Sequence, residues 1–348
     1  MSRSAACHSP DALQQFDVDW IDADRWSALG DCPADVIDLA DPAAGTRATA
    51  LRDRTGAVII GCDDRGQCPV VSPALFDILL TTARDAPQPW VSCDDIRSVA
   101  NRLAGLIGAN PVATTTLARL MRVGAELPFD DALMLESIAY SMLLGGAEFR
   151  RWRAATPVRG DRTATGAFVK IAREGDRLTL MLDRVEARNA VCAAMRNQLH
   201  EALAAALDDP SRPEVMITGN GPSFSAGGDL DEFGTAQDIA EAHAIRMLRY
   251  PVRLIHRLGP KASVRLQGAC IGAGIEMSAA AAIRIAAPDA FFQLPETRMG
   301  LIPGAGGTVS IPRRIGRHRA CFMAIGCDRI SASRGLEWGL VTGLGGSA

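Results

Sequence analysis

Two glutamates and three glycine-rich segments carry the residue types that could perform chemistry. Glu276 ends the segment QGACIGAGIE (267–276), and Glu296 follows it in FQLPETRMGLIPGAGGT (292–308). In chain order these are the second and third glycine-rich segments, because PSFSAGGDL (222–230) precedes both and is the first. Two carboxyl groups near one water push each other's pKa apart, so that one can act as an acid and the other as a base. If the fold brings Glu276 and Glu296 to one water, they could therefore serve general acid–base catalysis.

The glycines of the second segment favour a site for a developing negative charge. Gly268, Gly272 and Gly274 let the backbone approach a ligand closely. A helix is expected to start there, and its free N–H groups and positive dipole end would face the loop. For Glu276 alone a structural interpretation stays open, because a glutamate in the first turn of a helix is favourable without any catalytic role.

A dinucleotide-binding loop is a competing interpretation of the same glycines. A strand, a glycine-rich turn, a helix and an acid about 20 residues further on are its signature. The spacing argues against it, because the third glycine of that motif would fall at the position of Met277.

Each glycine-rich segment follows a predicted strand, and the second half of the chain predicts an α/β fold. The apolar patterns predict a strand hairpin over 168–182, a helix over 189–207, strands over 213–219, 261–268 and 290–293, and a helix after Gly274.

The first half of the chain is different, and we expect it to be mainly helical from about residue 92. Its patterns predict strands over 35–40 and 56–62 and a helix over 72–83, followed by helices over 94–107, 110–123, 128–144 and 147–155. A stretch rich in Pro, Gly and Arg over 156–165 suggests a domain boundary. We therefore divide the chain into regions 1–160 and 161–348.

Composition excludes several classes of protein. The chain is 48% apolar, and its net charge is -3. The apolar fraction is enough for a large buried core. The negative net charge gives no positive electrostatic field that would attract nucleic acid. The nine cysteines form no C-x-x-C pair, and the N-terminus has no apolar signal segment, so we expect a cytoplasmic protein with reduced thiols. The most apolar stretch, 268–287, carries Glu276 and Arg284, and we expect a buried helix there and no membrane span.

Several motifs in order give a family resemblance. From about Phe168 to Leu344 the chain resembles the enoyl-CoA hydratase/isomerase (crotonase) family. The segments that carry the likeness are LDRVEARNAVCAAM (182–195), FSAGGDL, GACIGAGIEMSAAAAIRIAAPDA, FQLPETRMGLIPGAGGT and CDRISASRGLEWGLV.

The resemblance implies the crotonase fold, a spiral of repeated ββα units, and a set of roles. Glu276 and Glu296 match the family's two catalytic glutamates. The backbone N–H groups of Ala226 and Ala273 match the two donors of its oxyanion hole, which would stabilise the enolate of a thioester. The residues expected to receive coenzyme A are Arg188, Ser225, Gly228, Asp229 and Gly272.

These roles imply an acyl-CoA enzyme, and hydration of a 2-enoyl-CoA is the leading hypothesis. An isomerase needs one carboxylate, so the pair favours a hydratase. Thioester hydrolysis, decarboxylation, cofactor-free oxygenation and a non-catalytic scaffold remain alternatives. The resemblance implies no cofactor beyond the coenzyme A of the substrate, no metal, and a homotrimer or dimer of trimers.

The chain departs from the family at its C-terminus. The family continues with several helices after the segment that matches GLEWGLV, whereas this sequence stops at Ala348. Residues 90–153, however, resemble those helices. We therefore hypothesise a rearranged architecture, in which the N-terminal helices take the place of the C-terminal ones, either within one chain or across a subunit interface.

Overall fold

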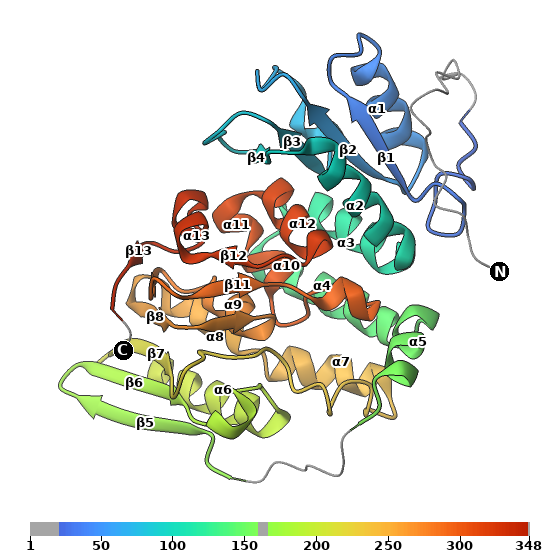
Figure 1. Cartoon of the computed structure of the whole chain (residues 1–348). Helices are drawn as coiled ribbons and strands as arrows, with labels where there is room; N and C mark the ends of the chain where they lie inside the picture. The colour runs from blue at the N-terminus through green and yellow to red at the C-terminus, as the bar shows by residue number, and fades with distance from the viewer. Residues whose placement is uncertain (1–20, 159–165, 347–348) are drawn as a thin grey trace.

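The computed structural model describes residues 21–158 and 166–346. Figure 1 shows a small sheet at one end, a large sheet at the other, and a helical layer between them. The predicted boundary at residue 160 lies outside the described residues.

The N-terminal end is a four-stranded parallel sheet in the order β1-β2-β3-β4. Its elements are β1 (Ala34–Asp38), α1 (Ala44–Arg54), β2 (Val58–Asp63), β3 (Ile78–Thr81) and β4 (Val91–Ser92). The strands predicted over 35–40 and 56–62 are confirmed as β1 and β2. One face of the sheet packs on a separate apolar cluster that includes Trp26, Leu51 and Phe76.

The helix predicted over 72–83 is wrong. The segment forms a short 3-10 turn, Pro73–Leu75, and then the central strand β3. Ile78, Leu79 and Leu80 are all fully buried between β2 and β4. A short, continuous apolar run fits a buried helix and a buried strand equally well, so its pattern could not separate the two.

The four helices predicted next are confirmed. They are α2 (Ile96–Ala109), α3 (Pro111–Gly124), α4 (Phe129–Leu144) and α5 (Ala147–Ala155). Asp95 caps α2 by accepting a hydrogen bond from the N–H of Ser98. Pro111 occupies the first turn of α3, where its missing N–H costs nothing.

The C-terminal region is a spiral in which the chain alternates between two sheets. The large sheet has the order β13-β10-β8-β7-β6-β5, and a small sheet has the order β12-β11-β9. The strands are β5 (Val169–Glu174), β6 (Arg177–Leu182), β7 (Glu214–Gly219), β8 (Ala262–Leu266), β9 (Ala269–Ile271), β10 (Ile283–Ala286), β11 (Phe291–Gln293), β12 (Ile330–Ser331) and β13 (Gly343–Leu344). Because β8-β9-α9 is followed by β10-β11 and further helices, the expected ββα repeat is present.

The helices of this region cover the two sheets. They are α6 (Ala193–Asp208), α7 (Ile239–Leu248), α8 (Pro251–Leu258), α9 (Ala273–Ser278), α10 (Gly307–Ser310), α11 (Pro312–Ile315), α12 (Arg317–Gly326) and α13 (Ala332–Trp338). The helix predicted over 189–207 starts later, at Ala193, because Arg188 and Asn189 adopt left-handed conformations. The side-chain amide of Asn189 instead donates to the carbonyls of Asn220 and Ser223.

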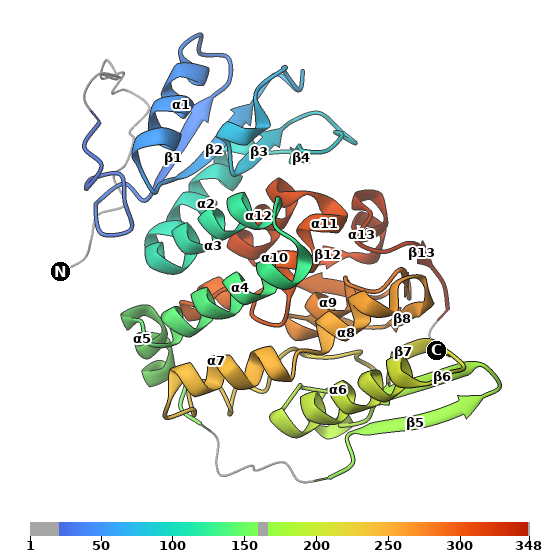
Figure 2. The same cartoon turned by 180° about the vertical axis from the view of Figure 1, so that it is seen from behind.

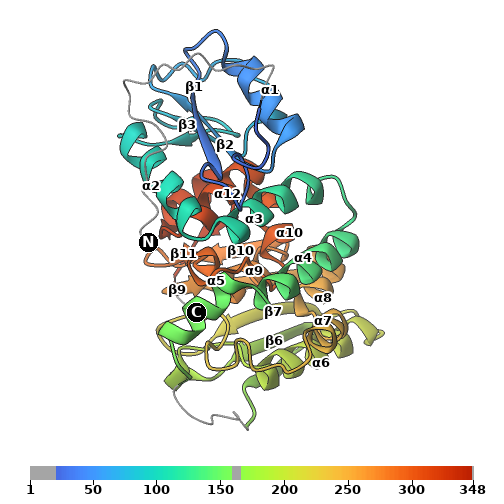
Figure 3. The same ribbon diagram turned by 90° about the vertical axis from the view of Figure 1, so that its right-hand side faces the viewer.

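Helices α2–α5 pack on the C-terminal region of the same chain. Helix α12 contacts α2 and α3, α10 contacts α3 and α4, α4 contacts α7, and α5 contacts the 3-10 turn η4 (Glu296–Met299). Figures 2 and 3 show α4 beside α7 and α10, and α5 next to the end of α4. One apolar core includes residues from Val58 to Val341. These contacts lie within one chain, and packing of the same helices across a subunit interface stays a prediction.

Candidate active site

The first two glycine-rich segments lie side by side. Ser225 pairs with β9: its N–H donates to the carbonyl of Ala269 at 3.1 Å, and its carbonyl accepts from the N–H of Ile271 at 3.0 Å. A side-chain carbon on Gly227 would lie 3.1 Å from the carbonyl oxygen of Ile271, so glycine allows the close approach. The topology thus joins segments 222–230 and 267–276 at one edge of the small sheet.

Glu276 lies on α9, and its side chain is buried, with 2% exposed. One carboxyl oxygen, Oε2, accepts hydrogen bonds from the N–H of Ala305 at 2.7 Å and from the N–H of Gly307 at 3.0 Å. These two residues belong to the third glycine-rich segment, so Glu276 connects the second segment to the third. Its other oxygen, Oε1, faces Gly272.

Glu296 follows β11 at the start of the turn η4, and it is 6% exposed. Its Oε2 is buried and has no hydrogen-bond partner among the described residues. A side-chain carbon placed on Gly272 would lie 2.5 Å from Oε1 of Glu296 and 3.7 Å from Oε1 of Glu276. The two carboxyl groups therefore face the same small space, which only a glycine at 272 leaves open.

Burial and mutual charge set the protonation of the pair. Burial raises the pKa of Glu276 well above its ordinary value of 4.5, and the charges of Glu296 and Glu136 raise it further. Burial also raises the pKa of Glu296 to about 8, with a smaller contribution from Glu136. Near neutral pH the pair therefore holds at least one proton, as an acid–base pair requires.

Both glutamates line a cavity of about 1060 Å³, together with Ala273, Gly228 and Asp229. Five of the nine predicted site residues thus lie around one space. Ala226, Ser225, Arg188 and Gly272 do not line it.

Ala226 does not fit the role predicted for it. Its N–H donates to the carbonyl oxygen of Arg188 at 2.9 Å, so this donor is already used. The N–H groups of Gly228 and Ala273, in contrast, donate no hydrogen bond within the described residues, and both residues line the cavity. Free backbone donors beside a pair of carboxyl groups can stabilise an oxyanion. The role predicted for Ala273 stays a prediction, and the N–H of Gly228 is better placed for the second donor than that of Ala226.

Two of the residues predicted to receive coenzyme A serve to hold the loops. Ser225 is fully buried, and its hydroxyl donates to the carbonyl of Asn189 at 2.7 Å. Asp229 accepts a 2.6 Å hydrogen bond from the buried side chain of Arg184. Arg188 is exposed and has a positive φ of 53°. A contact between coenzyme A and any of these residues stays a prediction.

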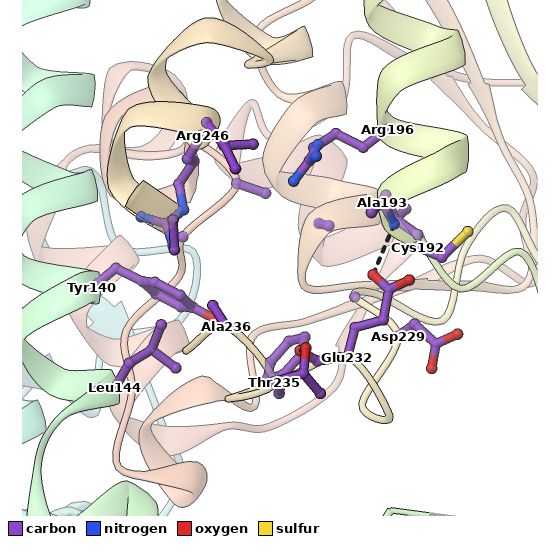
Figure 4. A pocket seen from close by; sticks show the side chains of 18 of the residues that line it. Tyr140, Leu144, Cys192, Ala193, Arg196, Asp229, Glu232, Thr235, Ala236 and Arg246 are labelled. Carbon is purple, nitrogen blue, oxygen red and sulfur yellow. Dashed lines mark hydrogen bonds between the residues drawn. The ribbon is translucent and has the colours of Figure 1, made fainter. Parts of the chain in front are cut away.

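The far wall of the cavity was not anticipated from the sequence, because it comes from the N-terminal half. Tyr140 and Leu144 of α4 line it, opposite Arg196 of α6 and Glu232, whose carboxylate accepts from the N–H of Ala193 (Figure 4).

A third buried glutamate, Glu136, lies behind the cavity on α4, fully buried. Glu136, Tyr140 and Leu144 recur at every fourth position and therefore share one helix face. That spacing was the one feature of the sequence that could have grouped these three residues. Nothing in the sequence indicated what the face would meet.

The described part of the chain contains neither a metal-binding cluster nor a helix suited to a membrane. Within 21–158 and 166–346, no three His, Cys, Asp or Glu side chains are grouped so that they could hold a metal ion. In the same ranges, no helix combines the length and the apolar character needed to cross a membrane.

Comparison with known proteins finds relatives in one family. The model of the enoyl-CoA hydratase/isomerase family matches residues 177–344. A probable enoyl-CoA hydratase of Rhodobacter capsulatus is 36% identical over 163 residues, 47% of this chain and 62% of that protein. The 2,3-dehydroadipyl-CoA hydratase of Escherichia coli is 33% identical over 172 residues, 49% of this chain and 67% of that protein.

A solved structure of an enoyl-CoA hydratase from Thermoplasma volcanium is 32% identical and has a TM-score of 0.48, covering 52% of this chain and 72% of that one. The chain spans less than two thirds of the length of the Rhodobacter relative. The identity shared with the Escherichia coli protein over two thirds of its length, and the family match across the β6–β13 region, show that the chain belongs to the enoyl-CoA hydratase/isomerase family.

Proposed function

We propose that this protein hydrates 2-enoyl-CoA thioesters. The observation that carries the proposal is the placement of two buried carboxyl groups, Glu276 and Glu296, around the space in front of Gly272. The N–H groups of Gly228 and Ala273, which donate to no other described residue, line the same cavity. This is the set of groups that adding water to an enoyl thioester needs: a base, an acid and an oxyanion hole.

The ionised carboxyl group of the pair takes a proton from water as the water oxygen bonds to C3 of the C2=C3 double bond. The electrons of that bond move through C2 to the thioester oxygen, where the N–H groups of Gly228 and Ala273 stabilise the enolate. The protonated carboxyl group then delivers its proton to C2 as the enolate collapses. The net reaction adds one water, and the pair has exchanged one proton between its members.

The test is the hydration of crotonyl-CoA, followed as the loss of enoyl thioester absorbance. Glu276→Gln and Glu296→Gln should each lower kcat by about a hundredfold or more, because each removes a group that must exchange a proton. Glu148→Gln is the matched control. Glu148 is a buried glutamate of α5 whose carboxylate accepts from the N–H groups of Val112 and Ala113, and it does not line the cavity. Full activity in both active-site variants would disprove the two-carboxylate mechanism.

Isomerisation of an enoyl-CoA is the second candidate. The unpartnered Oε2 of Glu296, free of bonds to the described residues, supports it, because one free carboxylate is enough to move a proton between C2 and C4. A relative from Mycosarcoma maydis is named an enoyl-CoA isomerase/hydratase. With 3-enoyl-CoA as substrate, an isomerase should lose activity in only one of the two glutamate variants. A hydratase should lose its activity on 2-enoyl-CoA in both.

The remaining parts of the proposal concern the cofactor, the oligomeric state and the location in the cell. The reaction consumes only water and the thioester, so we propose no cofactor beyond the substrate's coenzyme A. Met134, Ile138 and Met142 form an exposed apolar row on α4, which supports self-association. Sedimentation of the full chain tests for the trimer or hexamer.

Free thiols support a reducing, cytoplasmic location. Among the described residues they include Cys62, Cys68, Cys93, Cys192, Cys270, Cys321 and Cys327.

A further inference from the structure

The third glycine-rich segment contains a loop, residues 304–308, that a glutamate from the N-terminal half holds in place. The N–H of Gly306 donates to Oε1 of Glu136 at 2.7 Å, and the N–H of Thr308 donates to its Oε2 at 2.8 Å. The hydroxyl of Thr308 adds a bond of 2.6 Å to Oε2, and that of Tyr250 donates to Oε1 at 2.5 Å. Both carboxyl oxygens of Glu136 are thus occupied, and this residue is fully buried.

Two other N–H groups of the same loop point the other way. Those of Ala305 and Gly307 donate to Oε2 of Glu276, so successive residues of the loop alternate between the two glutamates. A loop whose N–H groups alternate in this way cannot shift toward one glutamate without losing bonds to the other. The position of Glu276 is therefore coupled to that of Glu136 through the backbone.

Packing of α4 against the loop reinforces the coupling. A side-chain carbon on Gly304 would overlap the ring of Tyr140, so this ring rests directly on the loop backbone. The guanidinium of Arg246 covers the ring at 4.6 Å from its centroid, and it donates hydrogen bonds to the hydroxyls of Ser137 and Ser141. Helix α4 is thereby fixed between the loop and α7.

We propose that Glu136 is a positioning residue for the acid–base pair: it fixes loop 304–308, and through that loop it fixes the carboxyl group of Glu276. The N-terminal helices then have a functional role as well as a structural one, because α4 completes the active site. This inference rests on the proposed function for its activity readout. The hold of Glu136 on loop 304–308 does not depend on which reaction takes place at this site.

The test compares Glu136→Gln with Glu148→Gln in the full chain. The amide introduced by Glu136→Gln keeps the shape of the side chain but offers an acceptor at only one of the two positions. We expect kcat for crotonyl-CoA to fall about tenfold or more, with KM little changed, because misplacing a catalytic group slows the chemical step. Backbone amides of 305–308 should exchange hydrogen faster in the same variant. Glu148→Gln should change neither quantity, even where it lowers the melting temperature by a similar amount.

A pH profile separates positioning from general loss of structure. The charge of Glu136 contributes to the raised pKa of Glu296. Glu136→Gln removes this charge, so the pH at which kcat changes with the ionisation of Glu296 should fall. In Glu148→Gln that pH should stay unchanged. Should Glu136→Gln fail to fold, Thr308→Val removes only the hydroxyl bond to Glu136. It should lower kcat and speed amide exchange at 305–308 in the same direction, but by less.

The outcomes distinguish the two proposals. Unchanged kcat, pH profile and amide exchange in folded Glu136→Gln would overturn the positioning role. Faster amide exchange at 305–308 in a protein whose wild type hydrates no enoyl-CoA would overturn the proposed function and leave the structural role of Glu136 standing.

Discussion

Glu136 and Glu276 accept hydrogen bonds from alternate backbone N–H groups of one loop, although they come from opposite halves of the chain. The two glutamates differ in which of their carboxyl oxygens have hydrogen-bond partners. Both oxygens of Glu136 are bonded, whereas Oε1 of Glu276 faces the space it shares with Glu296. The first is suited to hold the loop, and the second is suited to exchange a proton.

Replacing Ala273 by proline should remove one oxyanion donor while keeping the fold. Ala273 is the first residue of α9, where a proline is tolerated because that N–H has no partner within the helix. We expect kcat to fall by about a hundredfold to a thousandfold, the usual cost of losing one such donor. Ala273→Ser keeps the N–H and should retain most of the activity. A loss of the same size in both variants would mean that crowding, and not the donor, is responsible.

Replacing Gly272 by alanine should disturb the pair directly. Gly272 has a φ of 47°, a conformation that other residues rarely adopt, and its added methyl group would lie 2.5 Å from Oε1 of Glu296. We expect a destabilisation of about 1–3 kcal/mol and a loss of most activity. Gly175→Ala is the control, since its φ of 62° is also positive and an added methyl group in its hairpin turn would meet no atom within 4 Å. Equal activity in the two variants would show that the space between the glutamates is not needed.

The C-terminal region could be predicted well because its elements are set by local patterns. Alternating apolar residues predict the hairpin of β5 and β6, and the glycines of 267–276 predict the turn into α9. The positions of Glu276 and Glu296 followed from the family's spacing. What local patterns could not give is the hydrogen bonding of a single N–H, and for that reason Ala226 was chosen where the structure favours Gly228.

The contribution of α4 could not be predicted, because it depends on a contact between distant segments. Helix propensity and the glycines after Leu144 predict where α4 begins and ends. They do not predict that Glu136 faces loop 304–308 or that Tyr140 lines the cavity. A buried, charged residue on an otherwise apolar helix face is the feature that requires a partner, and the structure identifies it.

Stability should fall as the pH rises from about 5 to about 8, because a carboxyl group whose pKa is higher in the folded protein binds more protons there than in the unfolded chain. Burial raises the pKa of Glu296 from 4.5 to about 8, so the folded state is favoured below pH 4.5 and loses this advantage up to pH 8. The slope attributable to this group is at most about 1.4 kcal/mol per pH unit. Urea unfolding of Glu296→Gln at several pH values should show a flatter profile than wild type. An unchanged profile would show that Glu296 is not the group that titrates.

A buried ion cluster should stabilise the contact between the N-terminal sheet and the rest of the chain. Asp77, just before β3, accepts two hydrogen bonds from Arg122 of α3, at 2.8 and 2.5 Å, and it lies 3.8 Å from Arg317 of α12. Asp77→Asn should leave these arginines without a charged partner and destabilise the fold by about 3–5 kcal/mol. Because the cluster lies away from the cavity, kcat of the folded fraction should match that of wild type. A loss of stability in urea well below that range would mean that the apolar core alone joins the two parts.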